Sequence, residues 1–211
     1  MVFNNRKNGE WGQEEQRLKN PFSAGGEFDL RIRVNNENFQ VFGNRGYLGS
    51  ITQKAPLDQI RYIRIDGDLS GLRLVHYGGV VFKLPYYGAA ALTPGKRLDI
   101  SAWPAGNKIN IELHNSQRQH AFHMSIRFNE GAIVRNAMVE NSWGPEERGG
   151  GFPLSKNKVF DLTLVNENYG YQIYFNGRHF ASFAHRVSPT DITVLKIAGD
   201  LELYSVMLND A

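Results

Sequence analysis

The stretch HMSIRF, residues 123–128, alternates polar and apolar side chains without interruption. In an extended chain successive side chains point to opposite faces, so the polar residues of the stretch share one face and the apolar residues share the other. The polar set is His123, Ser125 and Arg127, and the apolar set is Met124, Ile126 and Phe128. The stretch therefore predicts a β-strand with one face in a core. Its other face carries an imidazole, a hydroxyl and a guanidinium that a core does not need.

Short alternating runs of the same kind recur along the chain, and helix signals are almost absent. The clearest are FDLRIRV at 28–34, KINIELH at 108–114, VFDLTL at 159–164 and YQIYFNG at 171–177. Segments rich in Asn and Gly, such as NENYG at 166–170, suit tight turns between antiparallel strands. The pattern predicts an all-β fold, an antiparallel β-sandwich in which inward residues of two sheets form the core.

Composition excludes several classes of site and partner. The 211 residues include no cysteine, which excludes disulfides, thiolate zinc sites and a cysteine nucleophile, and which fits a reducing compartment. The formal charge of +3 arises from basic residues scattered among acids, so we expect no nucleic-acid partner. No run of about 18 apolar residues occurs, and residues 1–11 lack the apolar stretch of a signal peptide. We expect no membrane insertion and a cytoplasmic protein.

The sequence repeats itself at an offset of 132 residues. Identical residues coincide without a gap at Val2/Val134, Asn4/Asn136, Trp11-Gly12/Trp143-Gly144, Glu14-Glu15/Glu146-Glu147, Phe28-Asp29-Leu30/Phe160-Asp161-Leu162, Asn44/Asn176 and Gly67-Asp68-Leu69/Gly199-Asp200-Leu201. Such self-similarity indicates a duplicated unit. We therefore expect an incomplete domain at 1–77, equivalent to the second half of the unit, and a complete domain at 78–211. The first copy has no counterpart of HMSIRF.

Polar residues suited to a sugar gather in three segments of the complete copy. They are His123, Ser125 and Arg127 in the first segment, Asn136 in the second, and Trp143, Glu146 and Arg148 in the third. Glu146 and Arg148 are two apart, so they share a face of an extended chain and can form charge-assisted hydrogen bonds. Sugar hydroxyls both donate and accept hydrogen bonds, and the C–H face of a pyranose packs on an aromatic ring.

The order and spacing of these residues resemble the galectin signature H-x-N-x-R, V-x-N and W-G-x-E-x-R. Here it reads His123-Met-Ser-Ile-Arg127, Val134-Arg-Asn136 and Trp143-Gly-Pro-Glu146-Glu-Arg148. The resemblance covers 78–211 and, through the repeat, 1–77, in the manner of a nematode tandem-repeat galectin. It implies a galectin-like jelly roll that binds β-galactoside-containing glycans or glycoconjugates without catalysis, metal or cofactor. Galectins can also leave cells without a signal peptide, which implies an extracellular location as well.

The resemblance also implies a role for each residue. In galectins the histidine and the first arginine hold the axial 4-hydroxyl of galactose, the V-x-N asparagine and the glutamate hold the 6-hydroxyl, the tryptophan stacks on the ring, and the arginines reach the neighbouring sugar. Ser125 stands where the family has asparagine, and a hydroxyl offers one donor instead of two. We therefore expect weakened or altered galactoside preference. The resemblance places His185 and Arg186 away from the sugar, and we expect no sugar site in residues 1–77.

Three other functions, as a glycosidase, a metal-binding protein or a scaffold, have less support in the residues. A glycosidase needs two carboxylates on one side of a ligand, but the adjacent Glu146 and Glu147 point to opposite faces of a strand. Asp200 and Glu202 share a face, although Asp200 follows a glycine at a predicted turn. No histidine or carboxylate cluster has metal-ligand spacing. The remaining alternative is a galectin-like scaffold that has lost sugar binding and self-associates through the partial copy, whose apolar sheet face would be open to partners.

Overall fold

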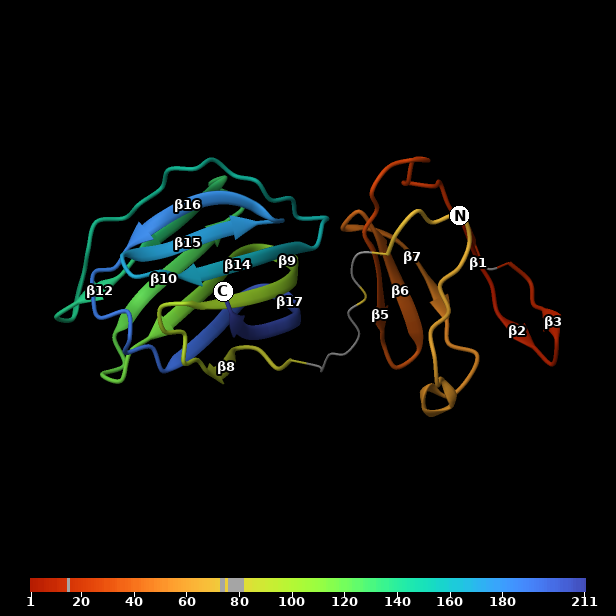
Figure 1. Ribbon diagram of the computed structural model, residues 1–211, viewed down its shortest axis with the longest axis horizontal. Coiled ribbons are helices and arrows are strands. Elements are labelled where there is room, and N and C mark those ends of the chain that lie inside the picture. Colours follow the sequence, from red (N-terminus) through yellow and green to blue (C-terminus); the bar gives the residue numbers. More distant parts are fainter. Residues whose placement is uncertain (15, 73–74, 76–81) are drawn as a thin grey trace. The chain divides into compact units, whose positions relative to one another are not determined.

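The chain folds into two compact units, Met1–Gly78 and Gly79–Ala211, in a computed structural model that describes residues 1–14, 16–72, 75 and 82–211. Both units are built from antiparallel strands (Figure 1). Over the described residues the helical structure is one 3₁₀ turn, η1 at Leu57–Gln59. The predicted all-β antiparallel fold is confirmed. The domain boundary expected between residues 77 and 78 lies outside the described residues.

None of the helical structure in the described ranges is long and apolar enough to cross a membrane.

One continuous hydrogen-bonded network forms most of the second unit. Its strands follow the order β11-β10-β9-β14-β15-β16, while β17 runs along β9 and β8 joins β17. A separate hairpin pairs β12 with β13. The strand bounds are β8 Tyr86–Ala89, β9 Lys96–His114, β10 His120–Arg127, β11 Ala132–Asn136, β12 Met138–Val139, β13 Ser142–Trp143, β14 Phe160–Asn166, β15 Gly170–Phe175, β16 Arg178–Ala184 and β17 Val194–Asp210.

The long strand β9 connects the two layers of this unit. Its residues 96–102 pair with β14, whereas residues 108–114 pair with β10. Asp200 of β17 stabilises the passage between these parts, because its Oδ2 accepts hydrogen bonds from the backbone N–H groups of Asn107 and Lys108 at 2.8 and 3.2 Å. Asp200 therefore serves the fold.

The core lies between the layer that contains β10 and the layer of β14, β15 and β16. Phe122 of β10 contacts Tyr171 of β15 and Phe183 of β16, with ring centroids 5.0 and 5.3 Å apart. Met124 and Ile126, the apolar face of HMSIRF, are fully buried. Burying side chains of this size stabilises the fold by about 1.5–3 kcal/mol each. The core thus fixes β10 with its polar face outward.

The first unit is built from shorter sheets. Its strands are β1 Val2–Phe3, β2 Arg6–Lys7, β3 Glu10–Trp11, β4 Gln16–Arg17, β5 Leu30–Val34, β6 Asn38–Gly43 and β7 Gly46–Thr52. They pair as β1-β4, β2-β3 and β5-β6-β7. Moved by 132 residues, the bounds of β2, β3, β6 and β7 coincide with those of β12, β13, β15 and β16.

Candidate functional site

The structure brings most of the predicted residues to one hollow of the second unit. A cavity of about 350 Å³ is lined by His123, Arg127, Asn136, Trp143, Gly144 and Glu146. His123 pairs across the sheet with Asn136, because β10 and β11 are neighbours. The β12–β13 hairpin then places Trp143 beside His123, with ring centroids 5.2 Å apart. Trp143 is 49% exposed, so its indole is open to a ligand.

Two arginines and two glutamates form a charged network at one side of the cavity. Arg148 donates to Glu146 through Nε at 2.9 Å and Nη2 at 2.6 Å, and Arg127 Nη2 lies 3.5 Å from the same carboxylate. Glu130 contacts both arginines, at 3.3 Å from Arg127 and 3.2 Å from Arg148. The hydrogen bond from Arg148 holds the pKa of Glu146 below its ordinary value. The network fixes the direction of both guanidinium groups.

Ser125 lies in the same row but below the surface. Its residue is fully buried, and its Oγ accepts a hydrogen bond from Arg127 Nε at 3.3 Å. The hydroxyl therefore contacts the arginine and is not exposed to the cavity. Its position beneath Arg127 makes it a positioning group for that side chain.

Asn136 is also buried, and its side chain is held from three sides. Its Nδ2 donates to Gly144 O at 2.8 Å, while its Oδ1 accepts from Ala137 N and from Arg186 Nη1, both at 2.8 Å. One Nδ2 hydrogen remains for a ligand. A Cβ at Gly144 would lie 2.5 Å from Arg186 Nη1, so a larger residue here would displace the Arg186 guanidinium.

Arg186 lies next to the site, contrary to the expected placement on the opposite face. The chain past the end of β16 returns it beneath Asn136, and its Nη2 donates to Glu147 Oε1 at 2.9 Å. Its guanidinium also covers the ring of Phe183, with the carbon 4.7 Å from the centroid. His185, in contrast, contacts the backbone oxygen of Glu167 at 2.8 Å and remains structural.

Sequence reasoning missed a second polar cluster that adjoins His123. Glu112 of β9 is only 5% exposed, yet its Oε1 lies 3.3 Å from His123 Nδ1. Its Oε2 lies 3.0 Å from Lys196 Nζ, 3.3 Å from His114 Nε2 and 3.9 Å from His120 Nδ1. The ring of His120 lies 4.8 Å from that of Trp143. The cluster therefore continues the polar face from β10 across β9 to β17.

The pKa values of two groups in this cluster are lowered. Burial would raise the pKa of Glu112, but interactions with His123 and Lys196 outweigh it and lower the pKa to about 2. Burial lowers the pKa of His120. Glu112 is therefore ionised and His120 neutral near pH 7.

A β-bulge explains why strict alternation did not reveal the cluster. The register shifts between His120 and Phe122, so Ala121 is an extra residue on β10. His120 then pairs with His114 and His123 pairs with Glu112, although His120 and His123 are three apart. A bulge puts such residues on one face of the sheet. The sequence did contain one sign of this cluster. Glu112 and His114 are two residues apart in KINIELH, so they share a face of the strand.

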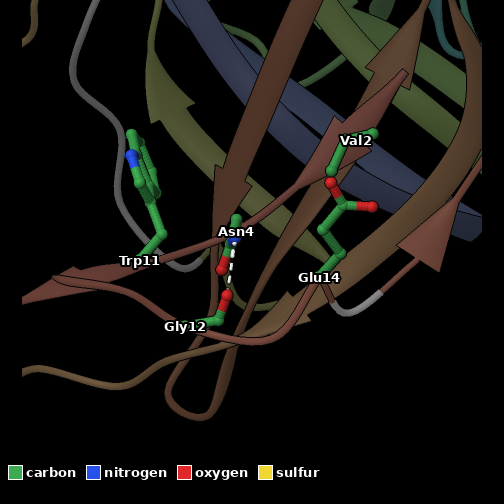
Figure 2. A pocket seen from close by; sticks show the side chains of 5 residues that line it. All are labelled: Val2, Asn4, Trp11, Gly12 and Glu14. Atoms are coloured by element: carbon green, nitrogen blue, oxygen red, sulfur yellow. Dashed lines mark hydrogen bonds between the residues drawn. The ribbon is translucent and has the colours of Figure 1, made fainter.

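The first unit has a cavity lined by the repeat counterparts of residues in and beside the cavity of the second unit (Figure 2). A cavity of about 680 Å³ is lined by Val2, Asn4, Trp11, Gly12 and Glu14, the residues that repeat Val134, Asn136, Trp143, Gly144 and Glu146. Asn4 Nδ2 donates to Gly12 O at 2.9 Å, as Asn136 does to Gly144. Among the described residues, however, β1 pairs with β4 alone and no strand occupies the place that β10 takes beside β11.

Comparisons with known proteins agree over nearly the whole chain. A family model described as galactoside-binding lectin matches residues 1–77 and 85–208. The chain is 38% identical over 212 residues to a 32 kDa beta-galactoside-binding lectin of Caenorhabditis elegans, covering 99% of this chain and 75% of the relative. It is likewise 38% identical over 214 residues to the lectin of that name from Haemonchus contortus, covering 99% and 74%. Galectin-4 of Homo sapiens is 26% identical over 250 residues, covering 99% of this chain and 77% of the relative.

Solved structures show the same architecture. The Caenorhabditis elegans galectin LEC-6 superposes with a TM-score of 0.56 at 28% identity and covers 60% of this chain and 91% of that chain. A human galectin-16 variant gives a TM-score of 0.58 at 23% identity, covering 62% of this chain and 99% of that chain, and supports the fold alone.

Proposed function

The chain belongs to the galactoside-binding lectin family, the galectins, and on that premise we propose that its second unit binds β-galactosides in the hollow beside Trp143. The observation that carries the proposal is the convergence of a half-exposed indole with His123, Arg127, Asn136 and Glu146 around one cavity. An aromatic plate beside donors and acceptors matches the two kinds of surface of a sugar ring.

Within this proposal, the roles known for the family are carried over to the residues around the cavity. Arg127 and His123 lie on the same face of β10 and both line the cavity, and they would hold the axial 4-hydroxyl of galactose. Asn136 retains one Nδ2 hydrogen, and Glu146 accepts, so both suit the 6-hydroxyl. Arg148, half exposed at the border, would reach the neighbouring sugar. Because Glu130 and Glu146 already fix both guanidinium groups, little side-chain entropy is lost when a sugar binds.

Ser125 sets the expected strength of binding. A disaccharide has about 23 heavy atoms, and about 0.3 kcal/mol per atom gives a Kd of about 10 μM. The buried Ser125 hydroxyl accepts a long hydrogen bond of 3.3 Å from Arg127. Serine holds Arg127 less firmly than the family asparagine would. The free energy of sugar binding is then less favourable by about 1–3 kcal/mol. We therefore expect a Kd in the high micromolar range and an altered glycan preference.

Binding without catalysis is part of the proposal. A glycosidase acid must hold its proton near neutral pH, which requires a raised pKa. The pKa of Glu146 is lowered by Arg148, so this carboxyl is a poor acid. Turnover of a reporter β-galactoside by the purified chain, lost on Glu146→Gln substitution, would contradict this part.

The duplication supplies a matched control for the sugar site. Lactose titration by calorimetry and a glycan array should show binding to the full chain that Trp143→Ala abolishes. Trp11→Ala removes the repeat counterpart, which is 69% exposed, and should leave binding unchanged. Loss of binding in Trp11→Ala but not in Trp143→Ala would place the site in the first unit and overturn the proposal.

A second function, self-association, is favoured by an exposed apolar row on β5. Leu30, Ile32 and Val34 are 47%, 58% and 52% exposed, whereas Leu162 and Leu164, the repeat counterparts of the first two, are buried in the second unit. We infer that this face pairs with the same face of a second copy, since two such sheets packed face to face restore a sandwich core.

Size-exclusion chromatography coupled to light scattering tests this pairing, because it measures the mass of the eluted protein. The full chain should be dimeric at micromolar concentration, and Ile32→Glu should make it monomeric. Gln59→Glu, an exposed substitution in η1, is the control and should remain dimeric. A wild-type chain that is monomeric throughout would refute self-association.

A further inference from the structure

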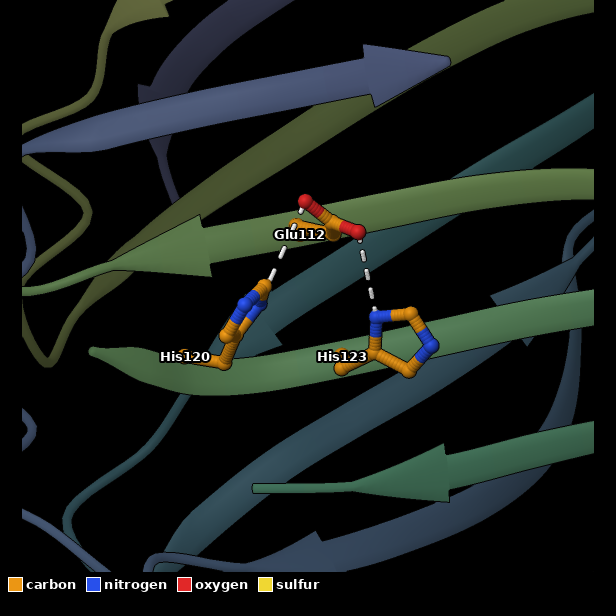
Figure 3. A group of neighbouring side chains, drawn as sticks. All are labelled: Glu112, His120 and His123. Carbon is orange, nitrogen blue, oxygen red and sulfur yellow. Dashed lines mark ion pairs between the residues drawn. The ribbon is translucent and has the colours of Figure 1, made fainter. Parts of the chain in front are cut away.

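We propose that Glu112, His120 and His123 form a binding site for a divalent transition-metal ion of the zinc type. Each residue offers one ligand atom, and the three atoms lie within 4.8 Å of one another. Figure 3 shows the two imidazole rings on either side of the carboxylate of Glu112. Two histidines and one carboxylate are a common ligand set for Zn²⁺ that leaves coordination positions open to solvent.

The inward ring nitrogens of His120 and His123 both face the Glu112 carboxylate. Within the part of the chain that the structure describes, the Nδ1 atoms of His120 and His123 are covered from solvent and have no hydrogen-bond partner. They lie 3.9 and 3.3 Å from the Glu112 carboxylate oxygens. Buried polar atoms without a partner are costly, and an ion between them and the carboxylate would satisfy all three groups.

The metal site uses one ring nitrogen of His123 and leaves the other for the sugar site. Coordination at Nδ1 of His123 leaves its Nε2 for the cavity beside Trp143. The metal site and the sugar site are therefore adjacent without sharing an atom.

The Lys196 ammonium and the His114 imidazole also face Glu112, and both affect how tightly a metal ion binds there. Lys196 Nζ lies 3.0 Å from Oε2, and His114 Nε2 lies 3.3 Å from the same oxygen. His114 Nδ1 lies 3.5 Å from Arg118 O, so that ring is engaged on both sides. The ammonium of Lys196 opposes a metal ion by like-charge repulsion, and it must move aside when the ion binds.

Calorimetric titration of the tag-free full chain with ZnCl₂ near pH 7.5 tests the proposal, with MgCl₂ as the comparison because Mg²⁺ prefers oxygen ligands. We expect one zinc ion per chain and no heat from magnesium. Glu112→Gln and His120→Gln should each weaken zinc binding by at least about 100-fold. Removing a residue that only contacts a metal ligand already costs up to about 100-fold, and removing a ligand itself should cost at least as much. Circular dichroism establishes that each variant is folded.

Two further variants separate this site from casual binding by surface histidines. Lys196→Met should strengthen zinc binding at least about threefold, because the competing charge is removed. His179→Gln alters an exposed histidine of β16 that bonds to Gln172, and it should bind zinc like the wild type. Absence of saturable binding at millimolar zinc, or equal affinity in wild type and folded His120→Gln, would overturn the proposal. The test uses no sugar, so its failure leaves the lectin proposal untouched.

Discussion

Replacement of Glu112 by glutamine should remove a large pH-dependent contribution to stability. The pKa of Glu112 falls from 4.5 to about 2 in the folded chain, because its contacts with His123 and Lys196 outweigh burial. At about 1.4 kcal/mol per pKa unit, this difference corresponds to about 3 kcal/mol. A carboxyl with a lowered folded pKa contributes stability above its unfolded pKa and loses it as pH falls. The contribution should therefore be complete at pH 7 and vanish as the pH falls from about 5 to about 2.

Urea unfolding in a Trp11→Phe background isolates the second unit in this experiment. The chain has three tryptophans, and this substitution leaves Trp103 and Trp143 as reporters, both in residues 79–211. At pH 7 we expect Glu112→Gln to lower the unfolding free energy by about 3 kcal/mol, with a flatter pH dependence between 5 and 2. Glu140→Gln, an exposed acid, is the control. Parallel pH curves for wild type and Glu112→Gln would refute the reasoning.

Two further predictions concern side chains beneath the cavity. Ser125→Asn should tighten lactose binding about tenfold, about 1.4 kcal/mol, because a carboxamide reaches Arg127 better than the hydroxyl does; equal affinity in the two proteins by calorimetry would contradict this. Arg186→Met removes the hydrogen bond to Asn136 Oδ1 and should weaken lactose binding about fivefold while destabilising the second unit by about 1.5–3 kcal/mol. Arg178→Met, at an exposed position of β16, is the matched control in the same titration, and an equal loss there would exclude a specific role for Arg186.

The strand that carries the site could be predicted because its pattern is local. Met124 and Ile126 alternate with polar residues, and hydrophobic burial alone selects which face turns inward. The motif spacing likewise anticipated that His123, Asn136 and Trp143 converge, since neighbouring strands and a short hairpin bring them together.

The parts that sequence did not reveal depend on pairing between distant strands. Glu112 meets His123 only through the register of β9 and β10, and His120 joins them only because of the bulge at Ala121. Residue spacing along the chain therefore gave no sign of a metal-ligand cluster. Arg186 was misplaced because its position depends on how the chain returns after β16, which strand alternation does not specify.

The central claim, that a galactoside binds beside Trp143, is tested most directly by an NMR titration of the full chain with lactose. The three tryptophans give three indole N–H signals, from Trp11, Trp103 and Trp143. The account predicts that the Trp143 signal shifts with saturation, together with the amides of β10 and β11, while the Trp11 signal stays in place. A saturable shift confined to Trp11, or no shift of any indole at millimolar lactose, would contradict it.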